Sequence, residues 1–396
     1  MRTQLTSGTF WPYLLLLTFS CYSLGGAPRS PTTTPKPPNA ATFKDARFIT
    51  DIFPFQVAFS LEQNNEILFE NPKVALMTET GYFVSNDKGD RLVRYHLDGS
   101  YDRTVAVAGE GPGELGRLSF ATKIFDGHVG FYDIGRSQIL AYSEKGDYLW
   151  SLNLRSLQLE NQTVLAVGSA FAWPKRDALL LTNVHHPNKP ETQGVKCRVS
   201  WRSPNQISEL TPLAWINNRP IEFEKKFGYG VVDQLAVLGN VYWVGCNFLP
   251  EFAMIDDQNE PRLLRTQKIT TPRALTKEHY SDLDASDRRA LMRLRNLNGT
   301  IHKMLVFDQT VWIKVGAIGW VPFDHQGNQL SKNRIKSRIG RFMDARGDTA
   351  MVIALRRHVE QWASFFDESF STASDHDDAD PDQPMILLMR LKTPYR

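Results

Sequence analysis

The chain has 396 residues, of which 42% are hydrophobic and 22% are charged, a composition typical of globular proteins and unlike that of disordered or many-span membrane proteins. Its 46 Lys and Arg residues nearly balance 43 Asp and Glu residues, and the net charge of +3 argues against nucleic acid as a partner. Three cysteines exclude a disulfide scaffold and a four-cysteine zinc site. Abundant glycine, proline and aromatic residues favour β structure with many turns.

Residues 1–27 have the pattern of an export signal. Arg2 precedes an apolar run over 11–20 that is too short to span a bilayer, and small residues near 23–27 suit a cleavage site. Cys21 follows Leu-Thr-Phe-Ser, which resembles a bacterial lipobox whose cysteine is lipidated. A plain secretory peptide stays open as the alternative. We therefore expect export to the periplasm or the extracellular space, with membrane contact only through a lipid on Cys21.

A Pro/Thr-rich segment over 28–43 follows the signal. Five of the twelve residues over 27–38 are proline, and such a segment forms an extended tether rather than a packed core. The remaining residues, 44–396, are expected to form one domain.

Three segments of that domain share a strand-and-turn signature, in which an aromatic residue is followed four positions later by glycine and a polar residue. The first two copies are 47 residues apart, and the third lies about four periods of 45 residues after the second. A weaker copy has Asn259 in the glycine position. Because glycine and asparagine tolerate positive φ, each copy predicts a hairpin. The repeat residues are Tyr95 and Gly99, Tyr142 and Gly146, and Phe323 and Gly327.

Four strands in each 45-residue period are typical of β-propeller blades. We predict an all-β fold, a six-bladed β-propeller of four-stranded antiparallel blades with one helical insertion. The segment 48–60 precedes the first blade, and it could add a strand to the last blade and leave no free sheet edge. The predicted blades cover 73–106, 119–155, 163–212, 230–272, 299–335 and 339–392, and the third and sixth are poor copies of the repeat.

A glycine-rich heptad, Gly-Glu-Gly-Pro-Gly-Glu-Leu over 109–115, lies between the first two predicted blades. It resembles the G-x-G-P-G-E-[FL] segment of the NHL-like six-bladed propellers found in exported bacterial proteins. The resemblance implies that the heptad links the outer strand of one blade to the inner strand of the next. A phosphate is not expected there, because proline offers no N–H and the glutamates repel anions. The residues that carry the resemblance include Gly109, Gly111, Pro112 and Gly113.

An insertion between the fourth and fifth predicted blades has a helical pattern over 286–296. Asp284 or Ser286 can cap the start of this helix, and apolar residues at 290, 291 and 294 give it one narrow apolar stripe. It is either a lid that binds a partner or a structural insertion packed on a blade. The candidate partner-binding residues are Arg288, Arg289, Arg293 and Arg295.

Other clusters give weaker signals. Asp375, Asp377, Asp378, Asp380 and Asp382 could bind Ca²⁺, although their spacing is not that of an EF-hand and a solvated loop is favoured. No other cofactor is predicted. The basic segment 332–341 is expected to be a solvated strand face. Adjacent His185 and His186 point different ways on extended backbone and are poor joint metal ligands. Cys197 and Cys246 either pair or stay as buried thiols.

No standard hydrolase, metalloprotease or phosphate-loop motif occurs in the sequence. We therefore expect a monomeric binding module that holds a protein, peptide or carbohydrate on its loop face or in its central channel. The alternative is an enzyme of the propeller type, a metal-dependent hydrolase, lactonase or lyase, which would need several inner-strand ligands around one cation. The fold supports both classes, so the question of catalysis stays open.

Overall fold

The computed structural model describes part of the chain, and all of that part lies in the second of two units, 37–396. The described residues are 55–61, 72–156, 158–159, 162–163, 171–175, 178–181, 184–186, 189–203, 206–216, 233–246, 251–256, 262–269, 284, 287, 289–290, 301–307, 309–316, 319–331, 335–336, 340–347, 349–361 and 384–391.

Five sheets have the antiparallel up-and-down order of propeller blades. Blade I contains β2 (Ala75–Met77), β3 (Tyr82–Ser85), β4 (Arg91–Tyr95) and β5 (Tyr101–Val107). Blade II contains β6 (Leu118–Lys123), β7 (Val129–Asp133), β8 (Gln138–Tyr142) and β9 (Tyr148–Asn153). Blade III contains β17 (Asp233–Leu238), β18 (Val241–Cys246), β19 (Glu251–Asp256) and β20 (Arg262–Lys268). Blade IV contains β21 (Ile301–Phe307), β22 (Thr310–Val315) and β23 (Gly319–Phe323).

Blade V joins the two ends of the domain. Its strands are β24 (Arg341–Arg346), β25 (Thr349–Leu355), β26 (Pro384–Leu391) and β1 (Phe55–Ser60). β1 pairs antiparallel with β26, and the Leu61 N–H donates to the Ile386 carbonyl at 2.9 Å. The predicted closure of the ring by the segment before the first blade is therefore confirmed.

The prediction of six four-stranded blades is wrong in its number, because the described residues form five blades. The region predicted to be the third blade instead contributes to a seven-stranded sheet. Its hairpin strands β15 and β16 are 15 and 11 residues long, and β10 pairs parallel with β16. The signature with glycine does not occur in the sequence of this region, so the repeat does not indicate where its strands end. The sheet contains β10 (Gln158–Leu159), β11 (Gln162–Thr163), β12 (Phe171–Lys175), β13 (Ala178–Leu181), β14 (Val184–His186), β15 (Lys189–Ser203) and β16 (Gln206–Ile216).

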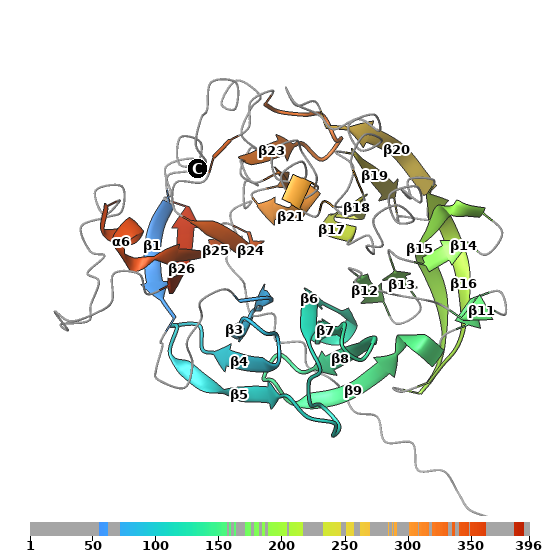
Figure 1. Cartoon of the computed structure of the whole chain (residues 1–396), viewed down its shortest axis with the longest axis horizontal. Helices are drawn as coiled ribbons and strands as arrows, with labels where there is room; N and C mark the ends of the chain where they lie inside the picture. The colour runs from blue at the N-terminus through green and yellow to red at the C-terminus, as the bar shows by residue number, and fades with distance from the viewer. Residues whose placement is uncertain are drawn as a thin grey trace, which may run out of the picture. The chain divides into compact units, whose positions relative to one another are not determined.

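One end strand of each sheet lies toward the centre of the ring (Figure 1), and we call these the inner strands. They are β2, β6, β12, β17, β21 and β24. β2 contacts β6 and β24, β6 contacts β12, and β21 contacts both β17 and β24. Each inner strand pairs antiparallel with the strand that follows it in the sequence, so the inner strands run in one direction and end on one face of the ring. We call that face the C-terminal face and the other the N-terminal face.

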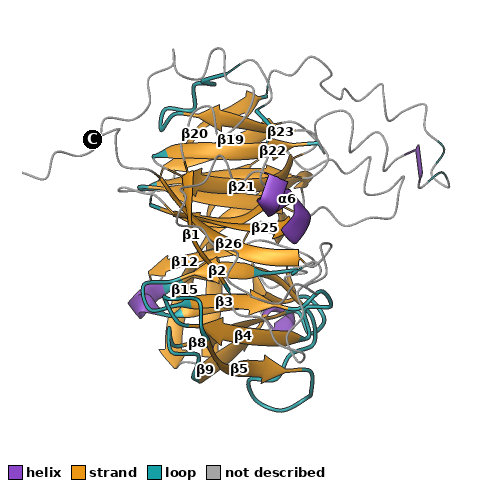
Figure 2. Cartoon of the chain, turned by 90° about the vertical axis from the view of Figure 1, so that its left-hand side faces the viewer, coloured by secondary structure: helices purple, strands orange, loops and turns teal. Residues whose placement is uncertain are grey.

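The apolar core lies between neighbouring blades. Phe83 and Leu92 of blade I pack with Phe131 and Leu140 of blade II, and the Phe83 and Phe131 ring centroids are 5.7 Å apart. A fully buried side chain of this size contributes about 1.5–3 kcal/mol, so each blade is stabilised chiefly by its neighbours. Helix is scarce among the described residues (Figure 2). They include the short helix α6 (Arg356–Gln361) and two 3₁₀ turns, η1 (Phe125–Gly127) and η2 (Leu154–Ser156).

The heptad over 109–115 connects β5 of blade I to β6 of blade II. The Gly109 N–H donates to the Leu115 carbonyl at 3.2 Å, and the Leu115 N–H donates to the Val107 carbonyl at 2.9 Å. Gly113 has a φ of +77°, and the Tyr142 hydroxyl donates to its carbonyl at 2.7 Å. The loop is therefore closed on itself and held to blade II.

The three turn glycines of the repeat follow the third strand of their blades. Gly99, Gly146 and Gly327 have φ values of +87°, +85° and +79°. Each N–H donates to the carbonyl three residues earlier, at 3.0, 2.9 and 2.9 Å respectively. A side chain at these positions is strained because L-residues rarely adopt this φ. Asn259 of the weaker copy lies outside the described residues.

Replacing Gly146 with valine should destabilise the domain by about 1–2 kcal/mol. A Cβ at this position would lie 2.9 Å from Val105 Cγ2, in addition to the backbone strain. Gly146→Asn is the matched variant, and it should lose less because asparagine tolerates positive φ. Chemical denaturation measures both, and equal losses for the two variants would contradict the assignment of strain to this turn.

Deleting residues 44–60 should open the ring by removing β1. The five register pairs between β1 and β26 would be lost, and at a net value of about 1 kcal/mol for each hydrogen bond the cost is on the order of 5 kcal/mol. The exposed edge of β26 would also promote association. Urea unfolding and size-exclusion chromatography test this. A monomer with unchanged stability would show that closure is unimportant.

Candidate functional site

Charged side chains from three blades meet on the C-terminal face of the ring. Lys123 ends β6, Arg346 ends β24, and Glu79 lies in the turn after β2. Lys123 Nζ lies 3.3 Å from Glu79 Oε1 and 2.9 Å from Glu144 Oε1, and Arg346 Nη2 lies 2.5 Å from the same Glu79 oxygen. We call these four residues the face network. It forms because the inner strands end side by side.

The face network is open to solvent at Glu79, whose side chain is 69% exposed. The hydrogen bond from Arg346 is the largest of the effects that lower the pKa of the Glu79 carboxyl below its ordinary value, followed by the hydrogen bond from Lys123. Both effects favour the ionised carboxylate. The network thus presents fixed charges of both signs to a partner.

A buried arginine holds the two turns that carry the glutamates of the face network. Arg94 on β4 is 5% exposed, and its Nε donates to the Glu144 carbonyl at 2.8 Å. Its Nη2 donates to the Thr80 carbonyl at 2.8 Å, and its Nη1 pairs with Asp102. These bonds tie the turn after β2 to the turn after β8. The position of Glu79 relative to Glu144 is therefore set by a satisfied guanidinium.

A second charged group lies among the strands of blades IV and V, and we call it the central cationic cluster. It contains Lys303 on β21, Lys314 on β22, and Arg341 and Asp344 on β24. Burial lowers the pKa of Lys303 to about 8, with Arg341 and Lys314 lowering it further and Asp344 opposing them. Burial likewise lowers the pKa of Lys314 and raises that of Asp344.

Hydrogen bonds hold two members of the cluster to neighbouring inner strands. Lys303 Nζ donates to the Met343 carbonyl of β24. Asp344 Oδ2 accepts the Met77 N–H of β2 at 2.7 Å. Each bond pairs a backbone group of an inner strand, the Met343 carbonyl or the Met77 N–H, with a charged side chain from the preceding blade. Both residues tie the ring together in addition to carrying charge.

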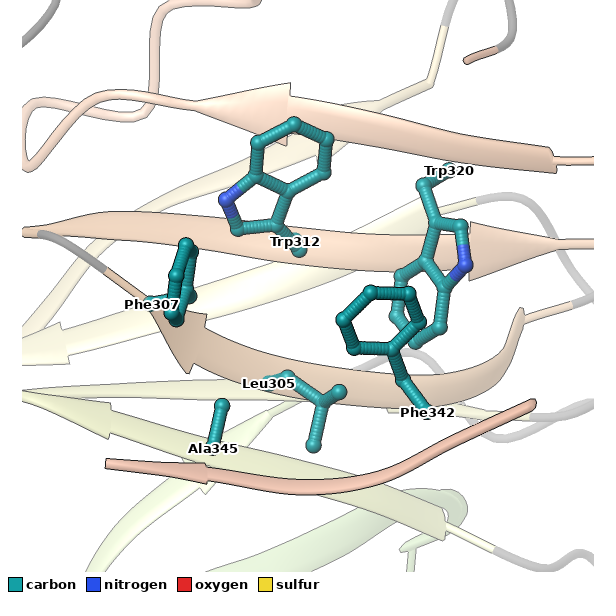
Figure 3. A pocket seen from close by; sticks show the side chains of 6 residues that line it. All are labelled: Leu305, Phe307, Trp312, Trp320, Phe342 and Ala345. Carbon is teal, nitrogen blue, oxygen red and sulfur yellow. The ribbon is translucent and has the colours of Figure 1, made fainter. Parts of the chain in front are cut away.

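An apolar cavity lies between blades IV and V (Figure 3). It has a volume of about 20 Å³, which is room for about one water molecule. Because it is small and has no polar lining surface, it is a packing gap rather than a ligand pocket. Its lining residues are Leu305, Phe307, Trp312, Trp320, Phe342 and Ala345.

Among the described residues, no three histidine, cysteine, aspartate or glutamate side chains come together as a metal site would require. The aspartates over 375–382, Cys21 and most of the basic segment 332–341 lie outside those residues. For four further candidates the structure describes the backbone, in β14, β15 and β18, but not the side chain. They are His185, His186, Cys197 and Cys246.

The predicted helical insertion is described at only a few positions. Arg289 and Ala290 are helical, and Arg289 is exposed. The Asp287 carboxylate accepts the Ala290 N–H at 2.8 Å, so Asp287 makes a capping contact at the start of this helix. Arg288, Arg293, Arg295 and Ser286 lie outside the described residues.

The sequence interpretation missed both charged groups. The sequence does contain a signal for the cationic cluster. Lys303 and Lys314 interrupt the largely apolar strand sequences IHKMLVF and TVWIKV. Lysine is rarely buried without a reason. Nothing in the sequence pairs Lys123 with Glu79 or Arg346, since their proximity arises only when the ring closes.

No protein-family model matches the chain, and no curated protein matches its sequence. Solved structures match the fold, among them two from Bacteroides species. One is a proposed exported protein from Bacteroides fragilis, with a TM-score of 0.57, 12% identity and coverage of 85% of this chain and 95% of that one. The other is a DUF4221 family member from Bacteroides vulgatus, with a TM-score of 0.50, 9% identity and coverage of 85% and 96%.

At sequence identities this low, the two matches show the β-propeller fold and nothing about activity. A looser match is virginiamycin B lyase from Staphylococcus aureus, with a TM-score of 0.44, 12% identity and coverage of 85% and 100%, and it supports no inference about activity. Among the described residues, no helix has the length and apolar character needed to cross a membrane.

Replacing Arg346 with glutamine should raise the pKa of the Glu79 carboxyl toward its ordinary value. Arg346 supplies the largest of the effects that lower this pKa, so Lys123→Gln should raise it less. NMR titration of the carboxyl carbon measures the pKa in all three proteins. An identical Glu79 pKa in the native protein and in Arg346→Gln would show that the face network does not form in solution.

Proposed function

We propose that the protein is an exported, monomeric β-propeller binding module that holds a protein, peptide or carbohydrate partner on its C-terminal face. The observation that carries this proposal is the face network, in which Glu79, Lys123 and Arg346 from three blades gather beside one another. Residues on the turns and strand ends of a rigid ring are well placed for recognition. Charges of both signs favour a partner with its own polar surface, because complementary charges give specificity.

The rigidity of the site also supports binding. Arg94 fixes the turns that carry Glu79 and Glu144, so little side-chain or loop freedom remains to be lost when a partner docks. Such preorganisation increases affinity without further contacts.

Export is part of the proposal. The N-terminal 27 residues carry the pattern of a secretory signal, and one of the proteins of similar fold is itself proposed to be exported. Lipidation of Cys21 would hold the module at a membrane through the Pro/Thr-rich tether. An NHL-like relationship, suggested by the heptad over 109–115, fits an exported propeller of this kind.

The test is a screen of peptide and glycan arrays, followed by titration of the bound probe against variants. Lys123→Ala and Arg346→Ala should each weaken binding by about tenfold, which corresponds to roughly 1.4 kcal/mol. Lys73→Ala is the matched control, since Lys73 is exposed and precedes β2 on the N-terminal face. This variant should bind the probe as the native protein does.

Equal weakening of binding by all three variants would contradict a binding site on the C-terminal face. The enzyme alternative predicts a different result, in which purified protein contains a stoichiometric metal and turns over lactone or ester substrates. That outcome, without any array binder, would replace the binding proposal.

A further inference from the structure

The cationic cluster places two lysines directly opposite each other on neighbouring strands. Lys303 on β21 is the register partner of Lys314 on β22, and Lys314 in turn faces Trp320 on β23. Directly opposed like charges destabilise a sheet. In the next row of the same sheet face, Leu305 pairs with Trp312, as a core-facing surface would require. The lysines therefore break an apolar pattern at one end of the interface between blades IV and V.

Arg341 adds a third cation to the same place. It begins β24, and its charge lowers the pKa of both lysines. Its Nη2 donates to the Pro72 carbonyl at 3.3 Å. Its Nε is buried and has no hydrogen-bond partner, which is costly for a charged group. A guanidinium is nevertheless suited to an oxygen anion, because it can bind such a group through more than one N–H.

Among the described residues, the negative charge near the cluster is smaller than its positive charge. Among the residues that the structure describes, none of the three cations has a carboxylate oxygen within ion-pair distance. Asp344 acts on Lys303 only through space, and one of its oxygens accepts the Met77 N–H. Asp87, in the turn after β3, attracts Arg341 from a distance. Three cations therefore share two remote carboxylates, and the cluster retains a net positive charge.

The cluster is accessible from outside the ring. Lys303, Lys314 and Arg341 are each partly exposed, and they lie toward the N-terminal face, where β21 and β24 begin and β22 ends. The face network lies at the other ends of the inner strands. The two charged groups are therefore separate sites, and an inference about the cationic cluster does not depend on the proposed function.

We propose that the central cationic cluster is a binding site for an oxyanion, the phosphate or carboxylate group of a small ligand that reaches blades IV and V from the N-terminal face. Lys314 and Arg341 contact the anion directly, and Lys303 holds it from deeper in the interface. The bound anion supplies negative charge that the described residues around the cluster lack. Partly desolvated cations without paired carboxylates are costly, so occupancy should stabilise the fold.

The experiment titrates purified protein with inorganic phosphate and, separately, with succinate, at an ionic strength held constant with sodium chloride. Binding is measured by isothermal titration calorimetry and by the melting temperature, which rises with occupancy when only the folded state binds. We expect saturable binding of at least one of the two probes. Lys314→Gln and Arg341→Gln should each weaken it by tenfold or more.

Lys145→Gln is the matched control, because it removes the same charge from an exposed residue in the turn after β8, which belongs to neither charged group. It should bind the probes as the native protein does. Without any anion, Lys314→Gln should melt no lower than the native protein, since it removes one of two opposed lysines. A purely structural role for Lys314 predicts the reverse.

Three results would overturn the proposal. They are the absence of saturable binding for both probes, an equal loss of binding in Lys145→Gln and Lys314→Gln, and a lower melting temperature for anion-free Lys314→Gln together with unchanged probe affinity. Binding of succinate alone would identify a carboxylate ligand, and binding of phosphate alone a phosphorylated one, and either result supports the site.

Discussion

The fold depends on the antiparallel pairing of β1 with β26, which joins residues from the two ends of the domain. A blade buries its apolar faces only against its neighbours, so an open row of blades would leave two of those faces in water. Closure removes both and also covers the edge of β26. Because the pairing partners are more than 300 positions apart in sequence, the entropy of closing the loop must be overcome by the interfaces between the blades.

Closure also determines the chemistry of the two faces. Inner strands that run in one direction bring their last residues together on one face and their first residues on the other. Arg346 meets Glu79 across the junction between the last and first blades, and Asp344 accepts the Met77 N–H across the same junction. Both contacts depend on the ring being closed. The charges that we assign to recognition are therefore consequences of the same constraint that stabilises the domain.

The sequence was sufficient to predict the propeller, the glycine turns and the closing strand, because each depends on a local pattern that repeats. Gly99 and Gly146 occupy equivalent hairpins in blades I and II. The number of blades could not be predicted, since β15 and β16 lack the turn signature and extend into a long hairpin. The charged sites were missed for a different reason. Lys123, Glu79 and Arg346 belong to three blades, and no local pattern encodes contacts between blades.

The cationic cluster illustrates a conflict between stability and recognition. A blade interface composed of Leu305, Trp312 and Trp320 is best completed by further apolar residues, and methionine at 303 or leucine at 314 would satisfy both the strand pattern and the packing. Lysine at both positions adds a desolvation cost, which lowers the pKa of both residues, and the charge of Lys314 lowers the pKa of Lys303 further. Local rules that are broken without internal compensation are characteristic of functional sites. The hydrogen bond from Lys303 to the Met343 carbonyl compensates one lysine only, and an external anion compensates the remaining charge.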